Sequence, residues 1–302
     1  MRFLFVDQIL NREHPNKITG VKHITPEDSF LCKIPESDQY CFIPTLVGET
    51  VGQLAAWHIM QQNNFTLRPV AGVVAEAILH QPAYVGQTLL LECEIVSHDE
   101  VAVEYHGHAS VNGELVFSVN GAIGPMLPME QFIDKKSVQQ QFLEIDRPGT
   151  LEDLLFYPAD SVIAAAECQE YLMQFDKVYD IHPKKSCKAF KKISRSSLYF
   201  ADHFPNKPVL PLTVLLECKR RLAQDFLFAS EWFSKYRLLR MEKIKMSDFV
   251  QPGDVIQTEL MVKKISSDQL ILHLRTFLPN KRICVVDLVY QAEGSCSNVV
   301  SP

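Results

Sequence analysis

The chain contains two long apolar segments, each followed by shorter runs in which apolar and polar residues alternate. The apolar segments cover residues 46–61 and 211–226, long enough for helices of about four turns. The alternating runs have the period of two that is typical of half-buried strands. We expect strands over residues 89–96, 101–111 and 115–124 after the first segment, and over residues 256–265, 270–278 and 283–292 after the second.

Short polar turns separate these runs, among them Asn112-Gly113 and Pro279-Asn280. Successive strands joined by tight turns form an antiparallel meander. Because the strands alternate in polarity, one face of each meander must be covered, and the long helix is the available cover. The pattern therefore predicts an α+β protein.

An internal repeat relates the two halves of the chain. The block at residues 84–92 corresponds to residues 251–259 at an offset of 167, and Asp7 corresponds to Asp176 at an offset of 169. The turn that begins at Pro15 corresponds to the turn that begins at Pro183, at an offset of 168. A nearly constant offset across separate blocks indicates two copies of one structural unit.

The repeat divides the chain into two units joined by a linker. We expect an N-terminal unit over residues 1–128, a linker over residues 129–150 and a C-terminal unit over residues 151–302. The linker belongs to the stretch 125–150, which contains three prolines and several charged residues. Residues 150–166 are expected to form a helix that leads into the second unit.

The composition is that of a globular protein and excludes several classes. The 302 residues are 47% apolar and 22% charged, which excludes disordered and fibrous chains. No apolar run approaches the roughly 18 residues of a membrane-spanning helix. The N-terminal sequence MRFLFVDQIL becomes charged too early for a secretory signal, so we expect a cytoplasmic protein. The eight cysteines form no CxxC pair, and we therefore expect neither a metal site nor a redox cofactor.

Charge is distributed unevenly along the chain. The formal net charge is −6, yet residues 1–150 hold 9 basic and 18 acidic residues whereas the remainder holds 21 basic and 18 acidic. An acidic chain argues against nucleic acid as the main partner. The basic second half is compatible with an acidic protein partner, which would dock on the run Lys219-Arg220-Arg221 or on the lysines between residues 184 and 192.

The strongest local motif is His203-Phe204-Pro205-Asn206-Lys207-Pro208-Val209-Leu210-Pro211, which is followed by the second predicted helix and Glu217. Pro211 suits a helix start because its missing N–H costs nothing there. The free N–H groups of such a helix, beside the loop that carries His203, can hold a carbonyl oxygen that gains negative charge.

This motif resembles the signature of the bacterial β-hydroxyacyl-(acyl carrier protein) dehydratases, which have the hot-dog fold. Their pattern runs His-Phe-Pro-Gly-x-Pro-x-x-Pro-Gly, with an acidic residue fourteen positions after the histidine. Asn206 and Leu212 depart from the two glycines. The repeat blocks resemble the strands of the same family, so the resemblance implies a double hot-dog, two antiparallel sheets each wrapped around a long helix. The positions that match the signature are His203, Phe204, Pro205, Pro208, Pro211 and Glu217.

The first half carries a degenerate copy of the motif. An offset of 164 residues places Gln39 opposite His203, Gly48 opposite Leu212 and Gln53 opposite Glu217. In the family that the motif resembles, the histidine comes from one hot-dog unit and the acid from the helix of its partner. The resemblance then implies one pocket with His203, Gly48 and Gln53, and a second with Gln39, Leu212 and Glu217.

Glutamine cannot act as a general acid near neutral pH, so the source of the acid stays open. Glu49 lies one helical turn before Gln53 and is an alternative carboxylate for the His203 pocket. Glu217 could act with His203 or could instead pair with an arginine. His203 itself could merely cap loop carbonyls. We select His203, Glu217 and Gln53 as candidate catalytic residues, and Gly48, Glu49, Pro211 and Leu212 as candidate substrate-binding residues.

The resemblance implies a lyase that dehydrates 3-hydroxyacyl thioesters in fatty-acid or polyketide-type biosynthesis. Its partner would be an acyl carrier protein or coenzyme A, no cofactor is needed, and pairing of two such chains into a homodimer is compatible with the arrangement. Two alternatives stay open, because a fold alone does not determine a reaction. One is a non-catalytic acyl-thioester-binding or partner subunit, and the other is a hot-dog thioesterase.

Overall fold

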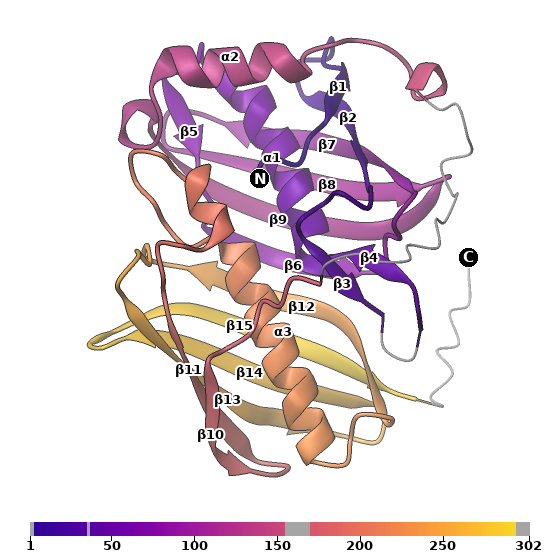
Figure 1. The fold of residues 1–302 in the computed structure, drawn as a ribbon, viewed down its shortest axis with the longest axis vertical. Helices are drawn as coiled ribbons and strands as arrows, with labels where there is room; N and C mark the ends of the chain where they lie inside the picture. The colour runs from indigo at the N-terminus through magenta and orange to yellow at the C-terminus, as the bar shows by residue number, and fades with distance from the viewer. Residues whose placement is uncertain (1–2, 35–36, 155–169, 294–302) are drawn as a thin grey trace.

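One large antiparallel sheet runs through both halves of the chain (Figure 1). The computed structural model describes residues 3–34, 37–154 and 170–293. The path of hydrogen-bonded strands is β1-β2-β7-β8-β9-β6-β12-β15-β14-β13-β11-β10, and β5 pairs with β9 beside it. The meanders that the sequence predicts after each helix are β7-β8-β9 and β13-β14-β15, and both are confirmed.

The first half holds most of its strands on one side of helix α1. The bounds are β1 Gln8–Asn11, β2 Lys17–His23, β3 Leu31–Lys33, β4 Tyr40–Phe42, α1 Pro44–Gln62, β5 Leu67–Pro69, β6 Val73–Leu79, β7 Thr88–His98, β8 Ala102–Val111 and β9 Glu114–Pro128.

The second half repeats this order around helix α3. The bounds are β10 Lys177–His182, β11 Ser186–Lys192, the 3-10 turn η3 Leu198–Ala201, α3 Leu212–Ala229, β12 Tyr236–Met246, β13 Val255–Ile265, β14 Gln269–Leu278 and β15 Lys281–Ala292.

The two halves meet edge to edge, so that the strand order of one mirrors that of the other. Strand β6 pairs antiparallel with β12, with Val74 opposite Ile244 and Glu76 opposite Glu242. Outward from this junction the order is β6-β9-β8-β7-β2-β1 on one side and β12-β15-β14-β13-β11-β10 on the other. Each strand along this path thus has an equivalent in the other half, which is the arrangement that the internal repeat predicts.

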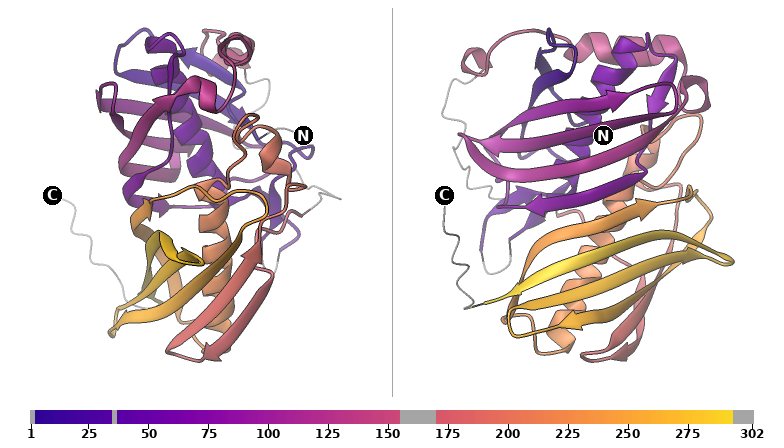
Figure 2. Two further views of the ribbon diagram at one scale, coloured as in Figure 1. Left: turned by 90° about the vertical axis from the view of Figure 1, so that its left-hand side faces the viewer. Right: turned by 180° about the vertical axis from the view of Figure 1, so that it is seen from behind.

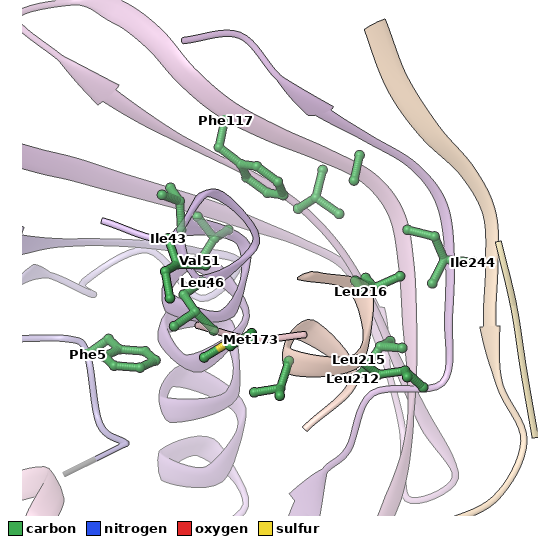
Figure 3. Close-up of a cluster of buried hydrophobic side chains, with 14 of the residues drawn as sticks. Phe5, Ile43, Leu46, Val51, Phe117, Met173, Leu212, Leu215, Leu216 and Ile244 are labelled. Carbon is green, nitrogen blue, oxygen red and sulfur yellow. The ribbon is translucent and has the colours of Figure 1, made fainter. Parts of the chain in front are cut away.

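The two long helices lie on one face of the sheet. The helices do not cover its other face, as the view from behind shows (Figure 2). Pro44 occupies the first turn of α1, where its missing N–H is tolerated. Both helices bury apolar residues against the sheet, and they contact each other where the halves meet. Figure 3 shows Leu46 of α1 in one hydrophobic cluster with Leu215 and Leu216 of α3. The predicted helices are therefore confirmed, with ends shifted by up to three residues.

The segment expected to be a linker is partly helical. Residues Met129–Gln131 form a 3-10 turn, and Lys135–Ile145 form α2, whose first turn is capped by the Asp134 side chain accepting from the Ser137 N–H at 2.9 Å. Phe142 of α2 packs against Trp57 and Phe65, so α2 covers the end of the first half. Of the helix expected over residues 150–166, the described part contains only the short turn Glu152–Leu154, and most of it lies outside the described residues.

The basic run Lys219-Arg220-Arg221 does not form a docking surface, and that expectation is wrong. Lys219 is fully buried and its Nζ lies 3.1 Å from the Cys284 Sγ. Arg220 and Arg221 are mostly buried beside Glu217. Long side chains on α3 face the core here because α3 is enclosed by the sheet and by α1. Over the residues described, no helix is long and apolar enough to cross a membrane.

Candidate active site

A cavity of about 180 Å³ lies where the two halves meet. Its wall is mainly apolar and comes from α1, the segment β5–β6, strand β9, the loop 203–210 and the first turns of α3. Four groups in this wall carry chemistry, and they come from both halves of the chain: Glu49, Arg68, Tyr105 and His203. Such a mostly apolar pocket with few polar groups is typical of a ligand site.

The loop that precedes α3 holds His203 in one orientation. The His203 N–H donates to the Tyr199 carbonyl at 2.9 Å, and the Val209 N–H donates to the His203 carbonyl at 3.0 Å. The imidazole Nδ1 lies 2.9 Å from the Val209 carbonyl oxygen. Because a carbonyl only accepts, Nδ1 must carry the proton, and the Nε2 lone pair is left free to take one.

Burial keeps His203 neutral. The ring is stacked on Phe204 at a centroid distance of 4.1 Å and meets the edge of Phe3 at 5.8 Å. Desolvation lowers the pKa of His203, Glu49 opposes this effect, and the positive charge of Arg68 adds to it. A neutral imidazole with a free Nε2 is suited to act as a general base.

Glu49 faces the same cavity from the second turn of α1. Its Oε1 accepts from the Gln53 side-chain amide at 3.1 Å, and its Oε2 accepts from the Thr213 hydroxyl at 2.7 Å. Thr213 belongs to α3, so the carboxylate is held between the two helices. The carboxyl group and the imidazole are therefore contributed by different halves to one cavity.

The helix boundaries show why Glu49 stands here. Helix α1 begins at Pro44 and α3 begins at Leu212, an offset of 168 residues. Glu49 and Glu217 thus occupy the same position in their helices. The offset of 164, taken from the motif alone, conflicts with these boundaries, whereas the offset of the repeat blocks agrees with them. Applied to the helices, the repeat offset would have identified Glu49 as the counterpart of Glu217.

Glu217 does not line the cavity. Its side chain is fully buried, and its carboxylate accepts from Arg220 at 2.6 and 2.9 Å, from Arg221 at 3.2 Å and from the Thr45 hydroxyl at 3.4 Å. Desolvation opposes the charge of Glu217, but the two guanidinium groups prevail and lower its pKa. This placement favours the alternative in which Glu217 pairs with arginine. Gln39 lies exposed in the β3–β4 turn.

Gln53 lines the cavity but is occupied by structural contacts. Its Oε1 accepts from the Phe5 N–H at 2.9 Å, and its Nε2 donates to the Phe3 carbonyl at 3.1 Å as well as to Glu49. It fastens the N-terminal segment, whose Phe3 packs on His203, and it orients the Glu49 carboxylate. The arrangement therefore makes Gln53 a positioning residue for both chemical groups.

Gly48, which the motif places opposite Leu212 at the start of the second helix, lines the cavity but does not lie at a helix start. It is the fifth residue of α1, so its N–H lies beyond the first turn. A Cβ at Gly48 would lie 2.7 Å from the Phe117 ring, which explains the need for glycine. The helix start in the cavity wall is that of α3, where Pro211 is the N-cap without a side-chain cap and the N–H groups of Leu212 and Thr213 point out of the helix.

Among the cavity residues that the sequence did not point to are Arg68, Tyr105 and Thr213. Arg68 lies in the short strand β5, which no alternating pattern marks. Tyr105 sits inside a predicted strand, and burial raises its pKa. Thr213 follows the motif directly. Thr45 stands opposite it at the offset of 168, and this repetition of a threonine was the sequence feature that could have identified Thr213.

Comparisons with known proteins show what this chain resembles. The ApeI-like family model, described as ApeI dehydratase, matches residues 180–283. The chain is 30% identical over 117 residues to the 3-hydroxyacyl-(acyl-carrier-protein) dehydratase FabZ of Aliarcobacter butzleri, a match that spans 36% of this chain and 80% of that protein. It is 25% identical over 138 residues to the same enzyme of Lactiplantibacillus plantarum, which spans 43% of this chain and 94% of that protein.

Two solved structures resemble the whole chain. A putative oleoyl thioesterase from Lactobacillus plantarum has a TM-score of 0.55 at 10% identity and covers 91% of this chain and 96% of its own. The dehydratase domain of PpsC from Mycobacterium tuberculosis has a TM-score of 0.53 at 9% identity, with coverage of 95% and 98%. At such low identity these likenesses bear on the fold alone.

The mirrored sheet with a long helix in each half defines the class as a double hot-dog protein. Within this class, the chain belongs to the FabZ family of 3-hydroxyacyl-(acyl-carrier-protein) dehydratases.

Proposed function

We propose that the chain dehydrates 3-hydroxyacyl thioesters at a single site between its two halves. The observation that carries this proposal is that His203 and Glu49, from different halves, face one apolar cavity. Dehydration requires a base for the C2 proton, an acid for the leaving hydroxyl and polarisation of the thioester carbonyl. The cavity offers one group for each task.

His203 is proposed as the base. Its Nε2 is free because Nδ1 donates to the Val209 carbonyl, and burial lowers its pKa so that the imidazole is neutral near pH 7. The carbonyl oxygen of the thioester would lie at the start of α3, where the N–H groups of Leu212 and Thr213 have no partner in their own helix. These donors and the helix dipole stabilise the negative charge that develops on that oxygen.

Glu49 is proposed as the acid. His203 removes the C2 proton, the electron pair forms the C2–C3 double bond, and the C3–O bond breaks as Glu49 protonates the hydroxyl group. The products are the 2-enoyl thioester and water. Transfer of the proton from the imidazolium to the Glu49 carboxylate restores both groups, so no other reactant is consumed.

Replacement of each group tests the proposal. We expect His203→Ala and Glu49→Gln each to lower kcat/KM about 10²–10⁴-fold on a 3-hydroxyacyl thioester of a carrier protein or coenzyme A. Formation of the conjugated enoyl thioester is followed by ultraviolet absorbance. The matched controls are His182→Ala and Glu114→Gln, which change exposed residues outside the cavity and should leave the rate unchanged.

The remaining outcomes separate the alternatives. Release of free thiol from an acyl thioester, without formation of an enoyl product, would assign the site to a thioesterase. Binding of acyl thioesters without turnover by the wild type would make the chain a non-catalytic subunit. Either result overturns the proposal.

A further inference from the structure

Arg68 places an unpaired positive charge in the wall of the cavity. No described residue forms a hydrogen bond or ion pair with its guanidinium, and its Nε is buried without a partner. The guanidinium lies over the face of Phe204, with its carbon 4.2 Å from the ring centroid. A cation stacked on a ring in this way keeps the N–H groups at its edge free for a ligand.

Among the described residues of the cavity, no carboxylate forms an ion pair with Arg68. Glu49 is the carboxylate that acts on Arg68 electrostatically, but both of its oxygens accept from Gln53 and Thr213. Desolvation lowers the pKa of Arg68 to about 10, which still leaves it charged near neutral pH. An unpaired buried charge is costly to a fold, so its presence here points to a bound group that completes the pair.

Arg68 also lies close to the proposed reaction centre. Phe204 contacts both groups, since its ring centroid is 4.2 Å from the guanidinium carbon and 4.1 Å from the centroid of the His203 ring. These contacts limit the separation of Arg68 from the imidazole to about 8 Å, the sum of the two contact distances. A thioester bound at His203 would therefore carry some of its atoms past Arg68.

We propose that Arg68 is an oxyanion-binding residue, which makes the cavity selective for acyl thioesters that carry a second, negatively charged oxygen group. The inference rests on the proposed function, whose substrate class it narrows. Two sources can supply the same chemistry: a carboxylate on the acyl group, or the phosphate of the carrier's phosphopantetheine arm. Guanidinium binds either group through two parallel N–H···O bonds.

Binding of non-reacting ligands tests this proposal without relying on turnover. Four saturated acyl thioesters of equal chain length are compared by calorimetry, ending in methyl or in carboxylate, and joined to N-acetylcysteamine or to phosphopantetheine. We expect wild-type protein to bind at least one anionic ligand about 10- to 100-fold more tightly than the uncharged one. Arg68→Met should abolish this preference and Arg68→Lys should retain part of it.

The pattern of the loss identifies the source of the oxyanion. A loss confined to carboxylate-ended ligands assigns Arg68 to the acyl group, and a loss confined to phosphopantetheine ligands assigns it to the arm. Arg237→Met makes the same change at an exposed site outside the cavity and should have no effect. Thermal melting checks that each variant is folded.

The proposal fails if Arg68→Met binds all four ligands as wild type does, or weakens charged and uncharged ligands equally. In that case Arg68 only shapes the wall. Turnover of a plain 3-hydroxyacyl thioester by a protein without anion preference would overturn this inference and leave the proposed dehydration standing. An Arg68-dependent preference for anionic ligands in a protein without turnover would support this inference and overturn the proposed dehydration.

Discussion

The surroundings of His203 give its side chain the tautomer and the burial that the proposed proton transfer requires. The Val209 carbonyl selects the tautomer, Phe3 and Phe204 remove water from the ring, and Gln53 fastens the segment that carries Phe3. None of these residues is chemically reactive in the proposed step. Their combined effect is a neutral base with one free nitrogen.

The depressed pKa of His203 predicts the acid limb of the pH–rate profile. The imidazole must be neutral to accept a proton, so kcat/KM rises as pH increases through its pKa. Because burial lowers that pKa, the midpoint should fall below the ordinary histidine value of about 6.5. An N-acetylcysteamine thioester is the suitable substrate, since it lacks a phosphate that titrates near pH 6. A limb centred above that value would contradict the assignment of His203 as the buried base.

At the scale of elements, α1 and α3 show that one helical position can serve two purposes. Glu49 opens onto the cavity and is held by a hydroxyl and an amide. Glu217, at the equivalent position, is enclosed by Arg220 and Arg221. The two arginines convert the second copy of the site into a buried ion-pair cluster.

This difference predicts that Glu217 matters for stability rather than for turnover. Glu217→Gln leaves the mostly buried Arg220 guanidinium without its carboxylate and leaves Arg221 only its longer contact with Glu170 at 3.9 Å. We expect the free energy of unfolding in urea to fall by about 3–5 kcal/mol. The folded Glu217→Gln protein should keep the kcat of the wild type. Asp38→Asn, which removes the exposed ion pair with Lys33, is the matched control and should not change stability.

Two further measurements test whether Glu217 acts through its ion pairs. Adding Arg220→Gln to Glu217→Gln removes a stranded charge and should restore part of the stability, as a double-mutant cycle measures. If the Glu217→Gln protein has wild-type stability but no turnover, the prediction is wrong and Glu217 is a catalytic residue.

The sequence predicted the repeated elements well because hydrophobic period and turn residues specify them locally. Both long helices and the strands that follow them could be found in this way, and so could the loop of His203. The motif alone did not favour Glu49 over Gln53 as the proposed acid, because the first copy lacks the histidine and keeps only Pro44 among the prolines that fix its register. Arg68 was beyond reach for another reason: its role depends on β5 lying beside β9, a contact between distant residues that no local pattern records.

At the scale of the whole molecule, the junction between the halves is what creates the site. Strands β6 and β12 join the two sheets into one, and α1 and α3 pack together on the same face. His203 comes from the second half and Glu49 from the first, so neither half contains the proposed catalytic pair. We infer that the two repeat units fold and act as one body rather than as two independent domains.

The two tryptophans allow this inference to be tested, because each half contains one of them. Trp57 lies in α1 and Trp232 follows α3, and both are buried. Trp57→Phe and Trp232→Phe leave a single fluorophore that reports on one half. We expect the two urea midpoints to coincide within error and to match the loss of helical circular dichroism, because the β6–β12 ladder and the helix contact must break together. Since either substitution can shift stability, both variants are also followed by circular dichroism as an internal reference. If the fluorescence midpoints differ and the circular dichroism resolves two steps, the halves unfold separately. The junction would then be too weak to keep His203 and Glu49 in one cavity.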